Sequence, residues 1–166
     1  MQTCEVVQVY LQEINNEYRE IVNQILKDEW HCPPSVSRGK LIDTTILPGF
    51  LFIENDVIKG VVTYNIEDEE CEIVTLNSFE ENRGIGTTLI KRVLDIAKKR
   101  NCKRLWLITT NDDINAMRFY QKKGFELKAA HINAMELSRK LKPSIPLIGM
   151  DNIPIKHELE FEISLK

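Results

Sequence analysis

A turn containing Gly84 and Gly86 joins two apolar segments that have different periodicities. Residues 71–76, before the turn, read as a strand with an apolar centre, and after it apolar residues recur at helical spacing up to about residue 99. A short run rich in Leu and Ile follows at residues 105–109. A strand, a glycine turn, a helix and a second strand form a βαβ unit, which places its two strands parallel.

Segments typical of strands and helices flank this unit on both sides. The N-terminal part predicts a strand, a helix and a hairpin, over residues 4–11, 16–30 and 49–64. The C-terminal part predicts a helix over residues 114–123, ended by Gly124, and strands over residues 125–130 and 157–165. Residues 31–48 and 131–156 each hold three prolines and predict a long loop and a long excursion. With 166 residues, the chain is expected to form one domain, residues 1–166, of α+β class with a mixed sheet.

The charge balance excludes one large class of function. The chain has 22 Lys and Arg residues against 25 Asp and Glu residues, a formal net charge of −3. Domains that bind nucleic acid by neutralising phosphates usually have a strongly basic balance, so no nucleic-acid partner is expected. The longest apolar stretch, residues 46–53, is interrupted by Pro48 and Gly49 and is far shorter than the ~18 residues of a membrane-spanning helix, so no membrane association is expected.

The cysteines favour a cytoplasmic protein that holds no metal. The four Cys residues form no Cys-x-x-Cys pair, and His31-Cys32 has no second clustered pair that would complete a zinc site. The first five residues do not open a secretory signal, in which a basic segment precedes an apolar one. Reduced thiols, no metal and a cytoplasmic location are therefore expected.

The glycine turn is also a candidate seat for a phosphate. Glycine lets an anion approach the main chain, and the first N–H groups of a helix have no partner and carry a partial positive charge. The triphosphate-binding loop is missing, and Leu89 stands where the dinucleotide fingerprint needs a small residue. A tight strand-to-helix turn without any ligand explains the same glycines, so both interpretations stay open at this point.

A second motif, about 30 residues later, gives the first one a context. The segment from Asp113 to Phe125 has Ala116, Tyr120 and a Gly-Phe pair at fixed spacing. Together with Glu81 to Gly86, it resembles the GNAT (GCN5-related N-acetyltransferase) family, whose motifs are Gln/Arg-x-x-Gly-x-Gly/Ala and Asn-x-x-Ala-x-x-x-Tyr followed by Gly-Phe. The likeness is clear over residues 70–125 and departs from the family pattern at Glu81 and Asp113. Residues 138–155 look like those of uncharacterised bacterial members.

The resemblance implies a mostly antiparallel GNAT-like sheet that binds acetyl-CoA as co-substrate. The coenzyme A pyrophosphate would lie on main-chain N–H groups of the glycine turn, and the pantetheine arm between the two parallel strands. Leu76 falls where family members offer an N–H to the thioester carbonyl. Tyr120 matches the family's general acid, although core packing is the alternative. Asp113 stands where the family has Asn, so the amide donor at that position is lost. Asn111 or Asn115 could supply it instead, unless these residues cap the helix. The implied turn residues are Asn82, Arg83, Gly84, Ile85, Gly86, Thr87 and Thr88.

The chemistry of acetyl transfer can be argued separately. An amine that attacks a thioester must first lose a proton that it normally holds up to pH ~10, and a carboxylate can accept that proton. The departing thiolate then needs a proton, which a phenol can supply. The resemblance implies Glu70 as the first candidate for the base, because it lies six residues before Leu76, where histone-modifying relatives carry their catalytic glutamate. Glu72, on the same face of its strand, is the second candidate. A solvated acidic turn over residues 67–72 is the alternative.

These observations predict an acetyl-CoA-dependent N-acetyltransferase that works by direct transfer in a ternary complex. The acceptor is expected to be a small-molecule or peptide amine, and Trp30, Arg38 and residues 131–156 are candidates to wall its pocket, with ordinary loop packing as the alternative. A non-catalytic acyl-CoA-binding regulatory module and a structural dimerisation domain are the competing hypotheses. Because family members often pair, a homodimer is compatible with the resemblance.

Overall fold

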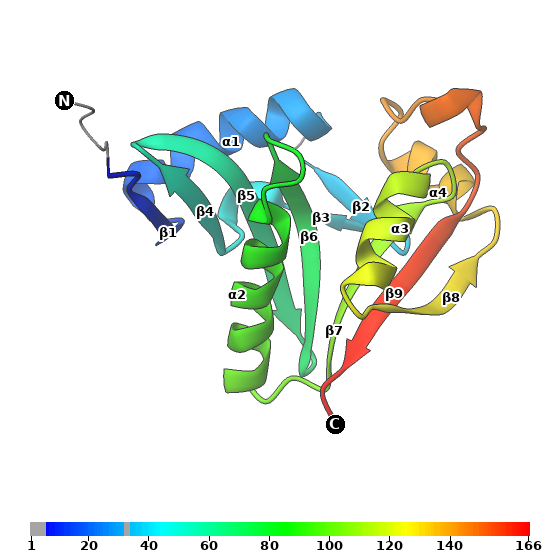
Figure 1. Ribbon diagram of the computed structural model, residues 1–166. Helices are drawn as coiled ribbons and strands as arrows, with labels where there is room; N and C mark the ends of the chain where they lie inside the picture. Colours follow the sequence, from blue (N-terminus) through cyan, green and yellow to red (C-terminus); the bar gives the residue numbers. More distant parts are fainter. Residues whose placement is uncertain (1–5, 32–33) are drawn as a thin grey trace.

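The computed structural model describes residues 6–31 and 34–166. Within these residues, one mixed sheet has seven strands in the order β1-β4-β5-β6-β7-β9-β8 (Figure 1). Every neighbouring pair is antiparallel except β6 and β7, the two strands of the βαβ unit. The strands are β1 (Val9–Glu13), β4 (Gly49–Glu54), β5 (Val57–Glu67), β6 (Glu70–Ser78), β7 (Arg104–Thr110), β8 (Glu126–His131) and β9 (Glu158–Ser164). This arrangement confirms the expected α+β class.

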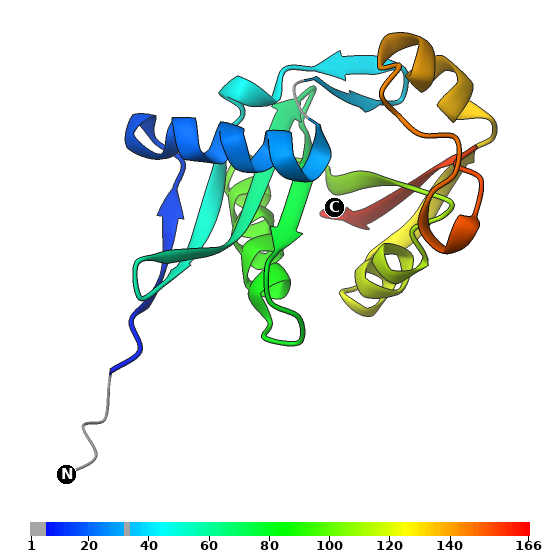
Figure 2. The ribbon, with the colours of Figure 1, turned by 90° about the horizontal axis from the view of Figure 1, so that it is seen from above.

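Helices cover both faces of the sheet (Figures 1 and 2). The helix α2 (Ile85–Lys99) buries its apolar stripe on one face, and α3 (Ile114–Lys122) packs against the same core. The helix α1 (Asn16–Trp30) buries Val22 and Leu26 against the opposite face, which the alternation of side chains along β4 and β5 makes apolar as well. The strands β4 and β5 are therefore buried on both faces.

Most of the predicted elements are present with small shifts of their ends. The helix predicted over residues 16–30 has those bounds, and the hairpin turns at Asn55 and Asp56, which both have a positive φ. The helix α3 is followed by Gly124, whose φ of 91° is the left-handed conformation expected there. The first strand covers Val9–Glu13; residues 4 and 5 of the predicted strand lie outside the described residues.

The long loop predicted over residues 31–48 is wrong in part. It contains a small hairpin of β2 (Ser35–Ser37) and β3 (Lys40–Ile42), followed by the short 3-10 helix η1 (Thr44–Ile46). The hairpin turns at Arg38 and Gly39, whose φ values of 49° and 71° suit a two-residue turn. Strands of three residues are too short for an alternating pattern to stand out, which is why the sequence suggested a loop.

The excursion predicted over residues 131–156 is also partly regular. It contains α4 (Ala134–Leu141) and the short 3-10 helix η2 (Met150–Asn152). The helix buries Met135 and Ser138, and its contacts are with distant segments: Ser138 Oγ donates to Glu158 at 2.9 Å, and Leu137 lies against Gly39. A helix of eight residues that is stabilised by such long-range contacts is hard to predict from the local sequence pattern.

Candidate active site

A β-bulge in β6 opens a gap in the middle of the sheet. Thr75 pairs with Thr63 and Ile73 with Tyr64, so Val74 is an extra residue with no partner on β5. A bulge bends its strand and increases the local twist. In the described residues, β6 and β7 pair only from Glu70 to Glu72, opposite Arg104 to Trp106, and diverge beyond that point (Figure 1). The two strands leave facing edges that no neighbouring strand pairs.

A cavity of about 320 Å³ occupies this gap. Its walls include residues 73–76 of β6 and residues 107–110 of β7, the segments beyond the last paired positions. Residues of α3, among them Ala116 and Tyr120, line it from one face of the sheet. Residues of β2 and α4 line it from the other face, where the β2–β3 hairpin reaches across to α4 (Figure 2). The cavity therefore connects the two faces through the gap between the strands.

The start of α2, close to the end of β6, has free main-chain donors. Asn15 and Asp113 cap the starts of α1 and α3 with their side chains, whereas no side chain among the described residues caps α2. Its N-cap residue, Gly84, has a φ of 72°, and a Cβ there would meet nothing within 4 Å. In the described residues, the N–H groups of Ile85, Gly86 and Thr87 donate no hydrogen bond. Free N–H groups at an open helix start form a ready anion site.

Two residues of the glycine turn have roles that the sequence did not suggest. Gly86 lies against Phe119 of α3, because a Cβ on Gly86 would come within 3.2 Å of its ring, so its small size lets α2 and α3 approach closely. Thr88 was expected to offer its N–H to a pyrophosphate. That N–H donates to the Gly84 carbonyl at 3.0 Å, as does the Thr88 hydroxyl at 2.9 Å, so the Thr88 N–H is not among the free donors of the turn.

Side chains on the strand-to-helix turn hold its shape. Arg83 makes a two-point ion pair with Glu54 of β4, at 2.9 and 2.6 Å, and a further ion pair with Glu80. The Arg83 guanidinium lowers the pKa of Glu54. Asn82 has a positive φ of 58°, which Asn tolerates better than most residues. Glu81, the departure from the family motif, is exposed.

Tyr120 is fixed by the way in which α3 ends. The N–H of Gly124 donates to the Gln121 carbonyl and that of Phe125 to the Tyr120 carbonyl, both at 3.1 Å, which is the pattern of a Schellman cap. The Phe125 ring then packs edge-on against Tyr120, with 5.5 Å between ring centres. Burial and the nearby Asp113 carboxylate raise the pKa of Tyr120, so its hydroxyl keeps its proton at neutral pH. The Tyr-x-x-x-Gly-Phe spacing is thus a capping motif that also orients a phenol at the cavity.

The three candidates around residue 113 differ in position. Asp113 lines the cavity and caps α3, accepting the Ala116 N–H at 2.9 Å. Asn111 holds the chain before β9: its side chain donates to the Pro154 carbonyl at 2.9 Å and accepts two N–H groups from residues 156 and 157. Its amide is therefore engaged in structure. Asn115 lies exposed in the first turn of α3.

The structure separates the two candidate bases. Glu70, the first candidate, pairs with Arg104 at 2.9 Å and is not among the described residues that line the cavity. Glu72 lines the cavity and is 7 % exposed. Burial raises the pKa of Glu72 to about 7, with the Ser37 hydroxyl and the Arg38 guanidinium opposing the shift. A carboxyl group with this pKa can accept a proton near neutral pH, so position and burial favour Glu72 over Glu70 as the candidate base.

The sequence did not single out several other polar residues of the cavity. Ser37, Ser138 and Glu158 come from β2, α4 and β9 and meet on the hairpin side. No motif or local spacing links them, since Ser37 and Glu158 are 121 positions apart. Trp30 lines the cavity as expected, and its indole N–H donates to Asn77 at 2.6 Å. Arg38 stacks on Trp106, 4.3 Å from the ring centre, and is not part of the wall as described.

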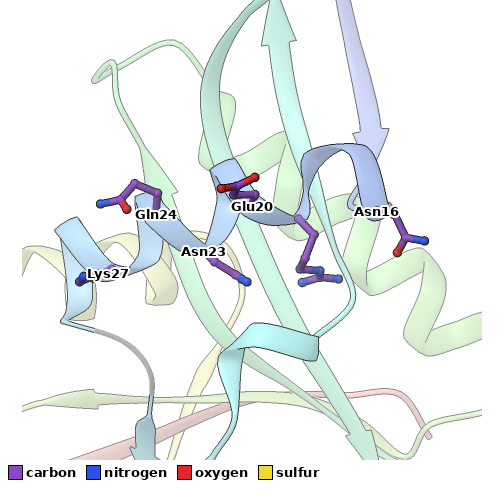
Figure 3. Close-up of a pocket in the computed structure, with 6 residues that line it drawn as sticks. Asn16, Glu20, Asn23, Gln24 and Lys27 are labelled. Atoms are coloured by element: carbon purple, nitrogen blue, oxygen red, sulfur yellow. The ribbon is translucent and has the colours of Figure 1, made fainter.

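A second hollow, of about 510 Å³, lies on the outer face of α1 (Figure 3). Its described lining residues, such as Asn16, Asn23 and Lys27, all belong to this one helix. A ligand there would touch one helix surface and remain in water on its other sides. The gap between β6 and β7 is therefore the better candidate site.

The described residues contain neither a cluster of metal ligands nor a membrane-spanning helix. Among residues 6–31 and 34–166, no group of three or more His, Cys, Asp or Glu residues is placed to hold a metal ion. The same part of the chain contains no helix that is long and apolar enough to cross a membrane. Cys32, half of the His31-Cys32 pair, lies outside the described residues, while Cys71 and Cys102 are buried free thiols.

Comparison with known proteins identifies the family. The family model described as "Acetyltransferase (GNAT) family" matches residues 11–125. The uncharacterised protein YxbD of Bacillus subtilis (strain 168) is 39% identical over 142 residues, which cover 85% of this chain and 89% of that protein.

Solved structures share the fold. An IAA acetyltransferase from Bacillus cereus ATCC 14579 superposes with a TM-score of 0.73 at 16% identity, covering 95% of this chain and 100% of the other. A GNAT family acetyltransferase from Elizabethkingia anophelis, solved with acetyl-CoA bound, gives a TM-score of 0.68 at 21% identity over 95% of this chain and 98% of the other. The resemblance seen in the motifs is confirmed: the chain belongs to the GNAT acetyltransferase family.

Proposed function

We propose that the protein transfers an acetyl group from acetyl-CoA to a primary amine, by direct attack within a ternary complex. The observation that carries the proposal is the cavity through the sheet. It brings a buried carboxyl group, Glu72, and a phenol, Tyr120, to one space that opens on both faces of the sheet. Such a space admits a cofactor from the α3 face and an acceptor from the hairpin face.

The cofactor side fits acetyl-CoA in two respects. The free N–H groups at residues 85–87 and the open space at Gly84 suit a pyrophosphate, for the electrostatic reason given above. The unpaired edges of β6 and β7 offer main-chain donors and acceptors to an extended, amide-bearing arm such as pantetheine. A relative of the same fold is known with acetyl-CoA bound. In the proposed site, Leu76 donates its N–H to the thioester carbonyl, a contact that strengthens as negative charge develops there.

The acid–base steps balance with two side chains. Glu72 takes the proton that leaves the acceptor ammonium, which frees the nitrogen lone pair to bond with the acetyl carbon. The bond between that carbon and sulfur then breaks, and Tyr120 donates its proton to the departing thiolate. The Tyr120 hydroxyl is protonated at neutral pH and can therefore donate as negative charge develops on the sulfur. The products are the acetylated amine and free coenzyme A.

The proposal is tested by mixing the protein with acetyl-CoA and a panel of primary amines and following the release of free thiol. Thiol release that depends on the amine, with the acetylated amine identified by mass spectrometry, supports the proposal. If acetyl-CoA raises the melting temperature but no amine releases thiol, the non-catalytic acyl-CoA-binding module is the better description. If acetyl-CoA does not change the melting temperature, both hypotheses are wrong.

A further inference from the structure

Three of the buried polar side chains on the hairpin side of the cavity are candidates to contact a ligand. Ser37 is 6 % exposed, Glu72 7 % and Glu158 2 %, and they come from β2, β6 and β9. Buried polar groups in folded proteins are almost always paired with hydrogen-bond partners, and buried charges with opposite charges. The pairing of these three groups therefore shows whether this part of the cavity is complete without a ligand.

Their pairing is incomplete. Among residues 6–31 and 34–166, Ser37 Oγ has no hydrogen-bond partner; it lies near enough to Glu72 to affect its pKa, but the two do not make a well-formed hydrogen bond. Glu158 accepts Ser138 Oγ at 2.9 Å and the Arg38 N–H at 3.1 Å, both from neutral groups. Within the same residues, neither Glu72 nor Glu158 makes an ion pair.

The neighbouring carboxylate on the same strand face shows what full pairing looks like. Glu160, two residues after Glu158, is ion-paired with Arg104 at 2.6 Å and lies 2.8 Å from His131. Although burial raises its pKa, the hydrogen bonds from these two residues lower it overall. The fold thus supplies cations to Glu160 and leaves Glu158, on the cavity wall, without one.

The rest of the cavity wall does not compensate these charges. Lys142 is the cationic side chain among the described lining residues, and its Nζ donates to the Trp30 carbonyl at 3.0 Å. Apolar side chains, including Met135, Ile145 and Ile155, complete the wall. The Arg38 guanidinium acts on Glu72 from outside the wall. A cavity with apolar walls and two carboxyl groups that make no ion pair in the described residues attracts small, positively charged organic molecules.

We propose that the hairpin side of the cavity is the acceptor site and takes a small amine that carries a second cationic group, with Ser37 and Glu158 as its specificity-determining residues. The proposal rests on the proposed function in treating the bound amine as the acetyl acceptor. In the proposed site, Glu72 faces the ammonium that loses its proton and reacts. Glu158 holds the second cationic group, which keeps its charge throughout the reaction. Ser37 Oγ accepts an N–H of the reacting ammonium beside Glu72.

The experiment measures binding by calorimetry on the full chain, with and without saturating coenzyme A, which has no acetyl group to transfer. The probes share a four-carbon spacing: 1,4-diaminobutane, 4-aminobutanol, butylamine and 4-aminobutanoate. We expect diaminobutane to bind at least about tenfold more tightly than butylamine or aminobutanol, and aminobutanoate to bind most weakly. Equal affinities for diaminobutane and butylamine, or a preference for the anionic probe, would overturn the proposal.

Two variants and a control locate the effect. Glu158→Gln should remove the preference for diaminobutane over butylamine, whereas Glu126→Gln, which neutralises an exposed acid on β8, should leave it unchanged. Ser37→Ala should weaken binding of both amines by about threefold to tenfold, without lowering the melting temperature, because the hydroxyl it removes has no partner in the described part of the chain. A lower melting temperature with unchanged affinity would assign Ser37 a structural role and contradict the proposal.

Turnover separates this proposal from the proposed function. If diaminobutane binds selectively but no thiol is released from acetyl-CoA, the proposed function fails, and the cation site stands as a binding site. If thiol is released equally well with butylamine and diaminobutane, the proposed function stands, and the assignment of Glu158 fails.

Discussion

The start of α2 and the hairpin side of the cavity both have unpaired polar groups, but the groups differ in kind. At the α2 start they are main-chain N–H groups of three consecutive residues, 85–87, beside a glycine that leaves open space. On the hairpin side they are side chains from three elements that are far apart in the sequence. One region attracts anions and the other cations. A main-chain site tolerates many side-chain changes around it, whereas a side-chain site can change its ligand through a single substitution.

The largest effect is expected at Glu72, the carboxyl group that lies between the two regions. If Glu72 is the base, Glu72→Gln should lower kcat by at least about 100-fold, since general-base catalysis contributes 10²–10⁴. In the unmodified protein, kcat/KM should rise with pH through about 7, where Glu72 loses its proton. The matched variant Glu70→Gln, at the Arg104 ion pair, should retain activity within about threefold. The reverse order of effects would restore Glu70 as the base.

Stability measurements distinguish this catalytic loss from damage to the fold. With a pKa of about 7, Glu72 in the folded state holds a proton that the unfolded chain, with the ordinary value of 4.5, has already lost. The stability that this group contributes is therefore present below about pH 4.5 and is lost as pH rises through about 7. Glu72→Gln avoids that loss, so its free energy of unfolding at pH 8 should exceed that of the unmodified protein by up to ~3 kcal/mol. Urea unfolding at pH 4 and pH 8 checks this difference.

The phenol on the cofactor side should have the next largest effect. Tyr120→Phe keeps the ring contact with Phe125 but removes the proton donor, so kcat should fall by about 100-fold while the KM for acetyl-CoA changes little. Steady-state kinetics from pH 6 to pH 10 check both quantities. An unchanged kcat across this range would leave Tyr120 with packing alone.

The α2 start should respond to charge more than to size. Gly84→Asp places a carboxylate beside the free N–H groups, where it would repel a pyrophosphate, and should raise the KM for acetyl-CoA by about tenfold or more. Gly84→Asn has nearly the same shape, and both residues tolerate the left-handed backbone at this position, so it should change the KM by no more than about threefold. Similar KM values for the two variants would show that the α2 start does not hold the pyrophosphate.

The smallest effect is expected at the ion pair that holds the turn. Glu54→Gln removes the carboxylate that receives Arg83 from β4 and should raise the KM for acetyl-CoA about twofold to fivefold, with kcat unchanged. The pair is partly exposed, so 0.5 M salt should reduce the difference between the variant and the unmodified protein. A fall in kcat would instead place Glu54 closer to the chemistry than its position on β4 suggests.

The regions also differ in what the sequence could predict. The glycine turn, Tyr120 and Gly124 lie within motifs whose spacing expresses local structure, an uncapped helix start and a Schellman cap, so they were found without a structure. Ser37 and Glu158 meet only after the hairpin and β9 pack on the sheet, and no local pattern connects them. The geometry that favours Glu72 over Glu70 could not be predicted for a related reason: period-two alternation put both on one face, but the Arg104 pairing that engages Glu70 depends on the register of β6 and β7.

Because of the bulge at Val74, an unusual set of backbone amides in this sheet should exchange rapidly with solvent. Central strands of a sheet are normally among the slowest regions to take up deuterium, because both edges of such a strand are hydrogen-bonded to neighbouring strands. Here, amides on the facing edges of β6 beyond Glu72 and of β7 beyond Trp106 have no cross-strand partner, so a fast-exchanging stripe should run through the interior. A molecule that lies between these edges would act as a temporary strand and slow the exchange. Deuterium exchange at these amides therefore shows whether a ligand occupies the gap between β6 and β7.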